Sequence, residues 1–308
     1  MRDKIILVHK GALGDFLQAW PSIFSIKKQF SDKEIFWAGR DEYFFFLEPI
    51  GIKKLDPRLK LEVDKIYTSS IWPEKLKDFF VIWFGLLTPP TQINFPNLFW
   101  VQGIKKDLYI PPYKVYLQEL KNIDVSPDPS WHKEWIKIFN PNPCVNRNRI
   151  LIFPGSGNPK RQWGLKKFLE LARWIEDEVN IKVCFVLGPV EIEQNMEVKN
   201  FEQKKLTQLK ELVEVLKMAK LVIGNDTGPL HLSSYMDIPT IAIFGPSSPK
   251  QWAPYKAEVV YKKIKCSPCS QIGKVMCSEI TCLKNIKVED VKNKIIKILI
   301  KAGLKAKD

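Results

Sequence analysis

The turn GNDTGP, residues 224–229, constrains the fold of this chain more than any other segment. It follows an apolar run at 221–223 and precedes a second short apolar segment, which is the order of a buried strand feeding a helix. Thr227 or Gly228 can cap that helix, and Pro229 suits its first position. Because unpaired backbone N–H groups and the positive end of the helix dipole attract anions, this turn predicts a phosphate site.

Two neighbouring residues bear on this interpretation. His231 lies four residues after Thr227, one helical turn further on and on the same face, so its side chain can add a donor to the same anion. Asp226 stands directly before Thr227. Strand-to-helix turns also carry Gly, Asp and Thr merely to form the turn and cap the helix, so a purely structural role stays open for this segment alone.

A second loop, PGSGNPKRQW at 154–163, has related chemistry and also joins an expected strand to an expected helix. The small residues Gly155 and Ser156 let backbone N–H groups approach a ligand, and Lys160 and Arg161 supply charged donors. The loop lacks the Gly-Lys-Ser/Thr ending of a P-loop, which disfavours an NTPase. Two phosphate-seeking turns at the carboxyl ends of neighbouring parallel strands predict a diphosphate site.

An alternation of strands and helices runs along the whole chain. Expected strands are 4–8, 34–38, 79–84, 98–101, 149–153, 181–187, 221–223 and 240–244, with helical patterns between several of them. A stretch rich in Pro and Asn at 122–148 interrupts the pattern and is the best candidate for a boundary. We therefore expect an α/β protein of two Rossmann-like domains, 1–148 and 149–308, with mostly parallel sheets and a closing amphipathic helix at 288–300.

The first expected strand leads into the turn GALGD, residues 11–15, where Asp15 opens a helix. A carboxylate at that position is either a helix cap or a general base. His9 at the end of the strand is a rival base, although we favour a role in orienting its neighbours. The turn does not complete GxGxxG, so a nicotinamide dehydrogenase is disfavoured.

The net charge of +14, from 48 Lys and Arg against 34 Asp and Glu, attracts anionic partners. The basic residues are scattered and no nucleic-acid-binding module is visible, so nucleic-acid binding is disfavoured. Alternatively, the lysine-rich surface and isoleucine-rich strands reflect only the codon usage or growth temperature of the source organism. No apolar stretch approaches the ~18 residues that span a bilayer, and the apolar start is too short for a signal peptide, so we expect a cytoplasmic protein.

Four of the six cysteines are spaced Cys266-x2-Cys269-x7-Cys277-x4-Cys282. This spacing permits a zinc site or a redox-sensitive pair, but no His lies nearby and the second pair lacks the C-x2-C spacing of zinc ribbons. Buried thiols or an occasional disulfide are the simpler account.

Together, GALGD, PGSGNPKRQW and LVIGNDTGPLHLSSYMDIPTIAIFGPSSP (221–249) resemble the lipopolysaccharide heptosyltransferases of glycosyltransferase family 9 in order and spacing. The resemblance covers most of the chain, and its last stretch is the most specific. It implies a GT-B fold, with two Rossmann-like domains facing each other across a cleft. The acceptor would be held mainly by the first domain and a nucleotide sugar by the second.

The resemblance also implies roles for individual residues. Asp15 would be the catalytic base, and Arg161, two residues before Trp163, occupies the place of the family's phosphate-binding lysine, with Lys160 as a possible substitute. Glu191, or else Glu193, would bind the ribose. The implied substrate-binding positions are Gly14, Gly155, Ser156, Lys160, Arg161, Glu191, Thr207 beside the adenine, and Asp226, Thr227, Gly228 and His231 around the diphosphate and sugar.

The implied activity is inverting, metal-independent transfer of heptose from ADP-heptose to a lipopolysaccharide inner-core acceptor, without a cofactor. Its partners would be the nucleotide sugar, an anionic glycolipid and the cytoplasmic face of the inner membrane, with no nucleic acid. The basic surface and the aromatic run DEYFFF (41–46) could help docking, although burial in the core also explains that run. The alternatives are a family 9 transferase with another nucleotide sugar or acceptor, and a non-catalytic protein that binds nucleotide sugars.

Overall fold

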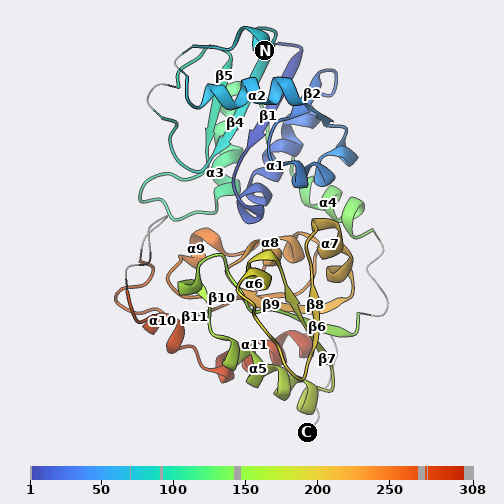
Figure 1. The fold of residues 1–308 in the computed structure, drawn as a ribbon, viewed down its shortest axis with the longest axis vertical. Helices are drawn as coiled ribbons and strands as arrows, with labels where there is room; N and C mark the ends of the chain where they lie inside the picture. Colours follow the sequence, from blue (N-terminus) through green and yellow to red (C-terminus); the bar gives the residue numbers. More distant parts are fainter. Residues whose placement is uncertain are drawn as a thin grey trace. The chain divides into compact units, whose positions relative to one another are not determined.

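The computed structural model describes residues 2–69, 71–90, 93–141, 147–269, 275 and 277–301. The chain divides into two compact units, Met1–Glu134 and Trp135–Asp308, and each is a layered α/β structure (Figure 1). The division falls within helix α4 (Trp131–Phe139), earlier than the boundary expected at 148. Trp135 belongs to the second unit because its buried ring packs edge-on against Tyr235, with centroids 5.4 Å apart.

The first unit holds a five-stranded sheet in the order β3-β2-β1-β4-β5, with every neighbouring pair parallel. Its strands are β1 (Lys4–His9), β2 (Glu34–Trp37), β3 (Lys53–Lys54), β4 (Phe79–Gly85) and β5 (Leu98–Gln102). Its longer helices are α1 (Leu13–Gln29), α2 (Pro57–Ile66) and α3 (Pro112–Glu119), and short 3-10 helices span Asp41–Phe46, Glu48–Ile50, Glu74–Leu76 and Leu120–Ile123.

The first unit buries apolar side chains on both faces of its sheet. Helix α2 covers one face, where Val63 and Ile66 join a core cluster with the strand residues Ile6 and Val8. On the other face the ring of Phe84 meets Tyr116 of α3 edge-on, with centroids 5.5 Å apart. Continuous apolar strands are what a sheet covered on both faces requires.

The aromatic run 41–46 belongs to the core of the first unit. Tyr43 and Phe46 are at most 1% exposed. The ring of Tyr43 stacks on Phe16 of α1 at 4.5 Å between centroids, and Phe44 and Phe45 are half-buried. The core alternative is therefore confirmed for Tyr43 and Phe46, because the short helix turns them toward α1 rather than toward solvent.

The second unit holds a six-stranded sheet in the order β11-β10-β9-β6-β7-β8, again with every pair parallel. Its strands are β6 (Arg149–Phe153), β7 (Lys182–Leu187), β8 (Glu202–Lys205), β9 (Ala219–Asn225), β10 (Thr240–Phe244) and β11 (Glu258–Tyr261). Its helices are α5 (Leu165–Trp174), which continues as a π-helical turn at Ile175–Val179, a 3-10 turn at Pro159–Arg161, α6 (Pro189–Glu193), α7 (Leu209–Lys217), α8 (Gly228–Tyr235), α9 (Pro249–Trp252), α10 (Thr281–Lys284) and α11 (Val288–Lys301).

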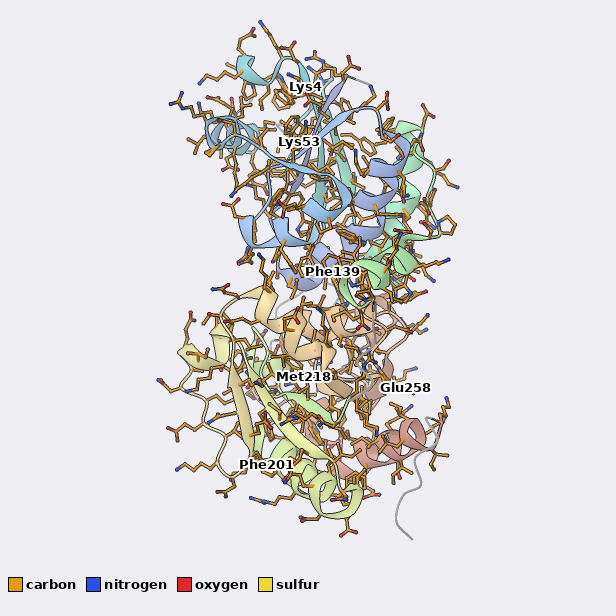
Figure 2. The ribbon with its side chains drawn as sticks, turned by 90° about the vertical axis from the view of Figure 1, so that its right-hand side faces the viewer. Lys4, Lys53, Phe139, Phe201, Met218 and Glu258 are labelled. Atoms are coloured by element: carbon orange, nitrogen blue, oxygen red, sulfur yellow. The ribbon has the colours of Figure 1, made fainter. Side chains whose placement is uncertain are left out.

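Packing in the second unit follows the amphipathic patterns of its helices. Figure 1 shows α5 and α11 side by side, and their buried residues Phe168 and Ile295 share one cluster with strand residues. Phe201, marked in Figure 2, packs its ring against Phe185 of β7 at 5.6 Å between centroids. Among the helices of the described ranges, none combines the length and the apolar character needed to cross a membrane.

In each sheet the order in which successive strands are added reverses beside the strand that comes first in the chain, β1 in the first unit and β6 in the second. In the second unit the chain builds β6, β7 and β8 toward one edge and then returns to place β9, β10 and β11 on the other side of β6. The corresponding change in the first unit lies between β1 and β4. In open parallel sheets, ligands bind beyond the carboxyl ends of the strands at such a switch point, so we expect a ligand site at the loops after β6 and β9.

Candidate functional site

Asn225, the last residue of β9, fastens the loop that follows β6. Its buried side-chain Nδ2 donates to the carbonyl oxygens of Pro154 at 2.7 Å and Gly155 at 3.2 Å, while its Oδ1 accepts the backbone N–H of Trp163 at 2.9 Å. One side chain therefore holds both ends of the loop 154–163. Asn225 lies inside the GNDTGP turn, but the sequence alone did not indicate this role for it.

Gly155 and Glu191 come together at the carboxyl ends of β6 and β7. Glu191 Oε2 accepts the backbone N–H of Gly188 at 2.8 Å, which fixes the carboxylate at the start of α6. A Cβ atom on Gly155 would overlap Glu191 Oε1, so a side chain at this position would displace the Glu191 carboxylate. Glu193, the alternative ribose ligand, is exposed. The structure thus brings Glu191 to the loop 154–163.

Arg161 and Asp226 bring a cation and a carboxylate to the switch point. Arg161 Nη1 lies 3.7 Å from Asp226 Oδ2. Burial raises the pKa of Asp226, and the Arg161 charge and the Ser247 hydroxyl oppose that rise. Lys160 lies differently, because its Nζ donates to the carbonyl of Val275 at 2.9 Å. Of the two basic residues of the loop, Arg161 is therefore the one beside the GNDTGP turn.

Several polar atoms around this turn are buried without a hydrogen-bond partner in the described part of the chain. They include Arg161 Nε, Asp226 Oδ2 and Thr227 Oγ1. Thr227 precedes α8 with extended backbone angles, yet its side chain caps none of the helix N–H groups. Because buried polar groups are normally paired, a cluster of unpaired ones at the start of a helix indicates a site shaped for the polar groups of a ligand.

His231 lies on α8 and is 4% exposed. Burial lowers its pKa to about 4, so the imidazole is neutral at pH 7. It can donate one N–H to an anion but brings no charge of its own.

The remaining candidates of the second unit lie on the same edge. Ser156 is buried, and its hydroxyl accepts the Asn158 N–H at 3.4 Å. Thr207 follows β8 and is exposed, and its N–H donates to Glu211 Oε2 at 3.0 Å in the cap of α7. Because that N–H is used within the protein, a contact from the Thr207 backbone to a base would fall to its carbonyl.

In the first unit, Gly14 and Asp15 lie in the first turn of α1, at the carboxyl end of β1. Asp15 is half-buried, and a Cβ atom on Gly11 would lie 3.1 Å from its Oδ2. Burial and the negative charge of Asp15 raise the pKa of Tyr43 and Tyr116, so two neutral phenols lie near this carboxylate.

His9 is a poor base in this setting. It is 2% exposed, and burial together with the Arg40 charge lowers its pKa to about 3. Its Nδ1 has no hydrogen-bond partner within the described ranges. Of the two candidate bases in the first unit, Asp15 is therefore the better placed.

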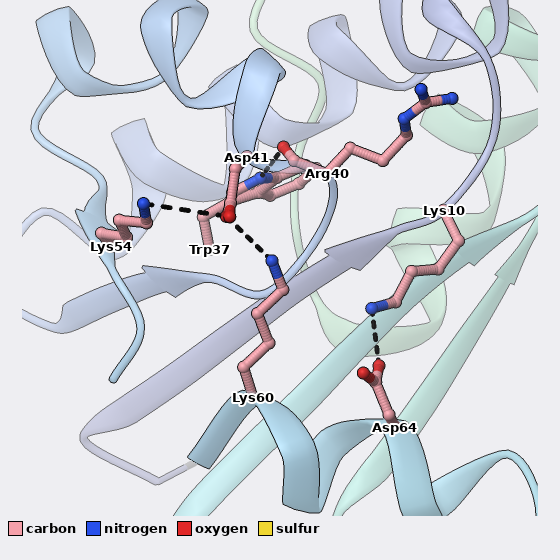
Figure 3. Close-up of polar contacts among 7 residues, drawn as sticks. All are labelled: Lys10, Trp37, Arg40, Asp41, Lys54, Lys60 and Asp64. Atoms are coloured by element: carbon pink, nitrogen blue, oxygen red, sulfur yellow. Dashed lines mark hydrogen bonds and ion pairs between the residues drawn. The ribbon is translucent and has the colours of Figure 1, made fainter. Parts of the chain in front are cut away.

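Exposed ion pairs line the same edge of the first unit (Figure 3). Lys10 Nζ lies 2.6 Å from Asp64 Oδ1, and Asp41 Oδ1 lies 2.8 Å from Lys60 and 3.9 Å from Lys54. Lys60 and Asp64 are one turn apart on α2, so this helix meets the loops that follow β2 and β1. Exposed pairs are weak and solvent-accessible, so these lysines can exchange partners for an anionic ligand.

The cysteines at 266–282 are free thiols. Burial and the neighbouring thiols of Cys277 and Cys266 raise the pKa of Cys269, and Cys282 is affected in the same direction. Within the described ranges, no group of three or more His, Cys, Asp or Glu side chains is placed to hold a metal ion. The zinc alternative thus finds no support in this part of the chain.

The family model for glycosyltransferase family 9 (heptosyltransferase) matches residues 117–278. A lipooligosaccharide heptosyltransferase 2 of Campylobacter jejuni serotype O:6 is 31% identical over 179 residues, which is 53% of this chain and 55% of that relative. The protein of the same name from serotype O:2 is 25% identical over 306 residues, covering 91% of this chain and 93% of the relative.

Among solved structures, the Escherichia coli ADP-heptose LPS heptosyltransferase II superposes with a TM-score of 0.67 at 15% identity, covering 97% of this chain and 99% of that one. This likeness confirms the α/β GT-B fold expected from the sequence.

Proposed function

Because the chain belongs to glycosyltransferase family 9 and is a glycosyltransferase, we propose that it transfers heptose from ADP-heptose to the inner core of a lipopolysaccharide. One observation supports this most: buried polar atoms of Arg161, Asp226 and Thr227 that have no hydrogen-bond partner among the described residues gather at the switch point of the second sheet. The names of the similar proteins, which include heptosyltransferases and an ADP-heptose enzyme, support the choice of donor and acceptor.

The donor is held by the second unit in this proposal. The N–H groups at the start of α8 and in the loop 154–163 bind the diphosphate, with Arg161 supplying the positive charge. Glu191 accepts hydrogen bonds from the ribose hydroxyls, and Thr207 lies beside the adenine. The position of these residues beyond the ends of neighbouring parallel strands supports one continuous donor site.

Transfer then proceeds with inversion. The Asp15 carboxylate removes the proton from an acceptor hydroxyl, whose oxygen attacks the anomeric carbon from the face opposite the diphosphate. The bond from that carbon to the β-phosphate oxygen breaks, and ADP leaves with the additional negative charge. Arg161, the neutral His231 and the helix N–H groups stabilise this charge, each well-placed donor by ~3 kcal/mol. These protein groups support a reaction without a metal or a cofactor.

The acceptor is an anionic glycolipid bound by the first unit, where Lys10 and Lys54 provide exposed cations and Lys60 a partly buried one. In this proposal the protein works in the cytoplasm and meets its acceptor at the inner surface of the inner membrane. The net charge of +14 supports attraction to that anionic surface. Nucleic acid has no part in it.

The test is a transfer assay with purified protein, ADP-heptose and lipopolysaccharide that lacks core heptose. We expect ADP release coupled to a heptosylated product of inverted configuration, unchanged by EDTA. Faster transfer from UDP- or GDP-sugars would contradict the donor assignment, and loss of activity in EDTA would contradict metal independence.

A further inference from the structure

The loop that follows β10 carries two buried polar side chains to which neither the sequence nor the proposed donor contacts assign a role. Ser247 is 5% exposed, and Gln251, in the first turn of α9, is completely buried. Neither the Nε2 nor the Oε1 atom of Gln251 has a hydrogen-bond partner in the described part of the chain, whereas the Ser247 hydroxyl interacts with the Asp226 carboxyl.

These side chains lie on the same edge as the candidate donor site. Strands β9 and β10 are parallel neighbours, with Asn225 opposite Ile243, so their following loops start side by side. The Ser247 hydroxyl is close enough to Asp226 to influence the pKa of that carboxyl. Gln251 follows four residues later in a turn closed by the bond from its N–H to the Ser248 carbonyl. The unpaired groups therefore extend from the start of α8 to α9.

The chemistry of a carboxamide indicates what this part of the site accepts. Burying a glutamine with neither end paired costs free energy that an apolar side chain of similar size would not cost. The amide offers both donor and acceptor atoms, which matches a hydroxyl group, whereas its oxygen would repel a phosphate. The cation suited to phosphate, Arg161, lies on the other side of Asp226, in the loop after β6.

We propose that Gln251, assisted by Ser247, binds hydroxyl groups of the sugar being transferred and thereby determines donor specificity. This inference rests on the proposed function, because it requires that a nucleotide sugar occupies the second unit. Among the described residues the amide finds no partner, and a sugar hydroxyl completes its hydrogen bonds. A nucleotide without its sugar makes no use of Gln251.

The experiment compares ADP and ADP-heptose as ligands of Gln251→Leu by calorimetry, with the exposed Gln203→Leu on β8 as the matched control. We expect the Kd for ADP-heptose to rise about tenfold or more, with the Kd for ADP unchanged. The melting temperature of Gln251→Leu should equal or exceed that of the wild type, because an unpaired buried amide has been removed. Ser247→Ala should show the same selective loss to a smaller degree.

Equal weakening of both ligands, or an unchanged Kd for ADP-heptose, would overturn the assignment of Gln251 while leaving the proposed function standing. A wild-type protein that binds neither ligand would refute the proposed function itself and this inference with it.

Discussion

Replacing Asn225 with alanine removes the side chain that shapes the candidate donor loop. The amide makes three buried hydrogen bonds, to the Pro154 and Gly155 carbonyls and from the Trp163 N–H. Each contributes about 1 kcal/mol net, so we expect a loss of about 3 kcal/mol in the free energy of unfolding. For a unit of this size that corresponds to a fall of roughly 6–12 °C in melting temperature.

The assay is thermal unfolding followed by calorimetric titration with ADP, and the exposed Asn148→Ala serves as the control. ADP affinity should fall together with stability in Asn225→Ala, because the loop 154–163 loses both of its attachments. Asn225→Asp should be at least as unstable near pH 7, since it sets a negative oxygen against two carbonyl oxygens. If Asn225→Ala melts within about 1 °C of the wild type and binds ADP equally well, the reasoning is refuted.

Asp15→Asn should lower kcat by about 10²–10⁴-fold with an unchanged Kd for ADP-heptose. The exposed Asp32→Asn is the control and should behave as wild type. Near-normal turnover of Asp15→Asn would show that Asp15 is not the base. Gly155→Ala should weaken ADP binding, because the new Cβ would displace the Glu191 carboxylate, and an unaltered Kd would contradict this. Burial lowers the pKa of His231 from 6.5 in the unfolded chain to about 4 in the folded protein. As the pH falls from about 6.5 to 4, the unfolded chain takes up this proton first, so the free energy of unfolding should fall by about 3 kcal/mol. The melting temperature of His231→Gln should therefore fall less steeply with decreasing pH than that of the wild type. Parallel curves of melting temperature against pH would contradict the lowered pKa of His231.

The inner strands of the two parallel sheets were predictable because they are short continuous apolar runs separated by helical patterns. The strands β3 (Lys53–Lys54), β8 (Glu202–Lys205) and β11 (Glu258–Tyr261) were not expected, because they lie at the sheet edges and are short, and β3 and β8 consist of polar residues. The phosphate-seeking turns were visible because Gly, Pro and capping residues mark strand-to-helix junctions in the sequence itself. Their meeting at one edge also followed, since the carboxyl ends of parallel strands share an edge. These are consequences of local chemistry and sheet topology.

The choices between neighbouring residues required the structure. Lys160 and Arg161 have the same charge, but in the structure Lys160 donates to the carbonyl of Val275, far along the chain, whereas Arg161 lies beside Asp226. Gln251 carries no sequence signal, because a glutamine in a short helix is ordinarily exposed, and its burial depends on packing around β10.

The boundary between the two units also depends on contacts between residues far apart in the sequence. The Pro-rich stretch at 122–148 indicated a boundary, but the packing of Trp135 on Tyr235 assigns part of that stretch to the second unit. An amphipathic helix shows which of its faces is buried without showing which core buries it. The roles of the two domains in binding acceptor and donor remain predictions.

A crystal structure of the protein with ADP would show whether the second unit binds a nucleoside diphosphate at the junction of β6 and β9. We expect the two phosphates at the start of α8, within hydrogen-bond distance of Arg161 and the Thr227 hydroxyl, with the ribose at Glu191. Phosphates bound at any other edge of the sheet, away from Arg161 and Thr227, would rule out this donor site.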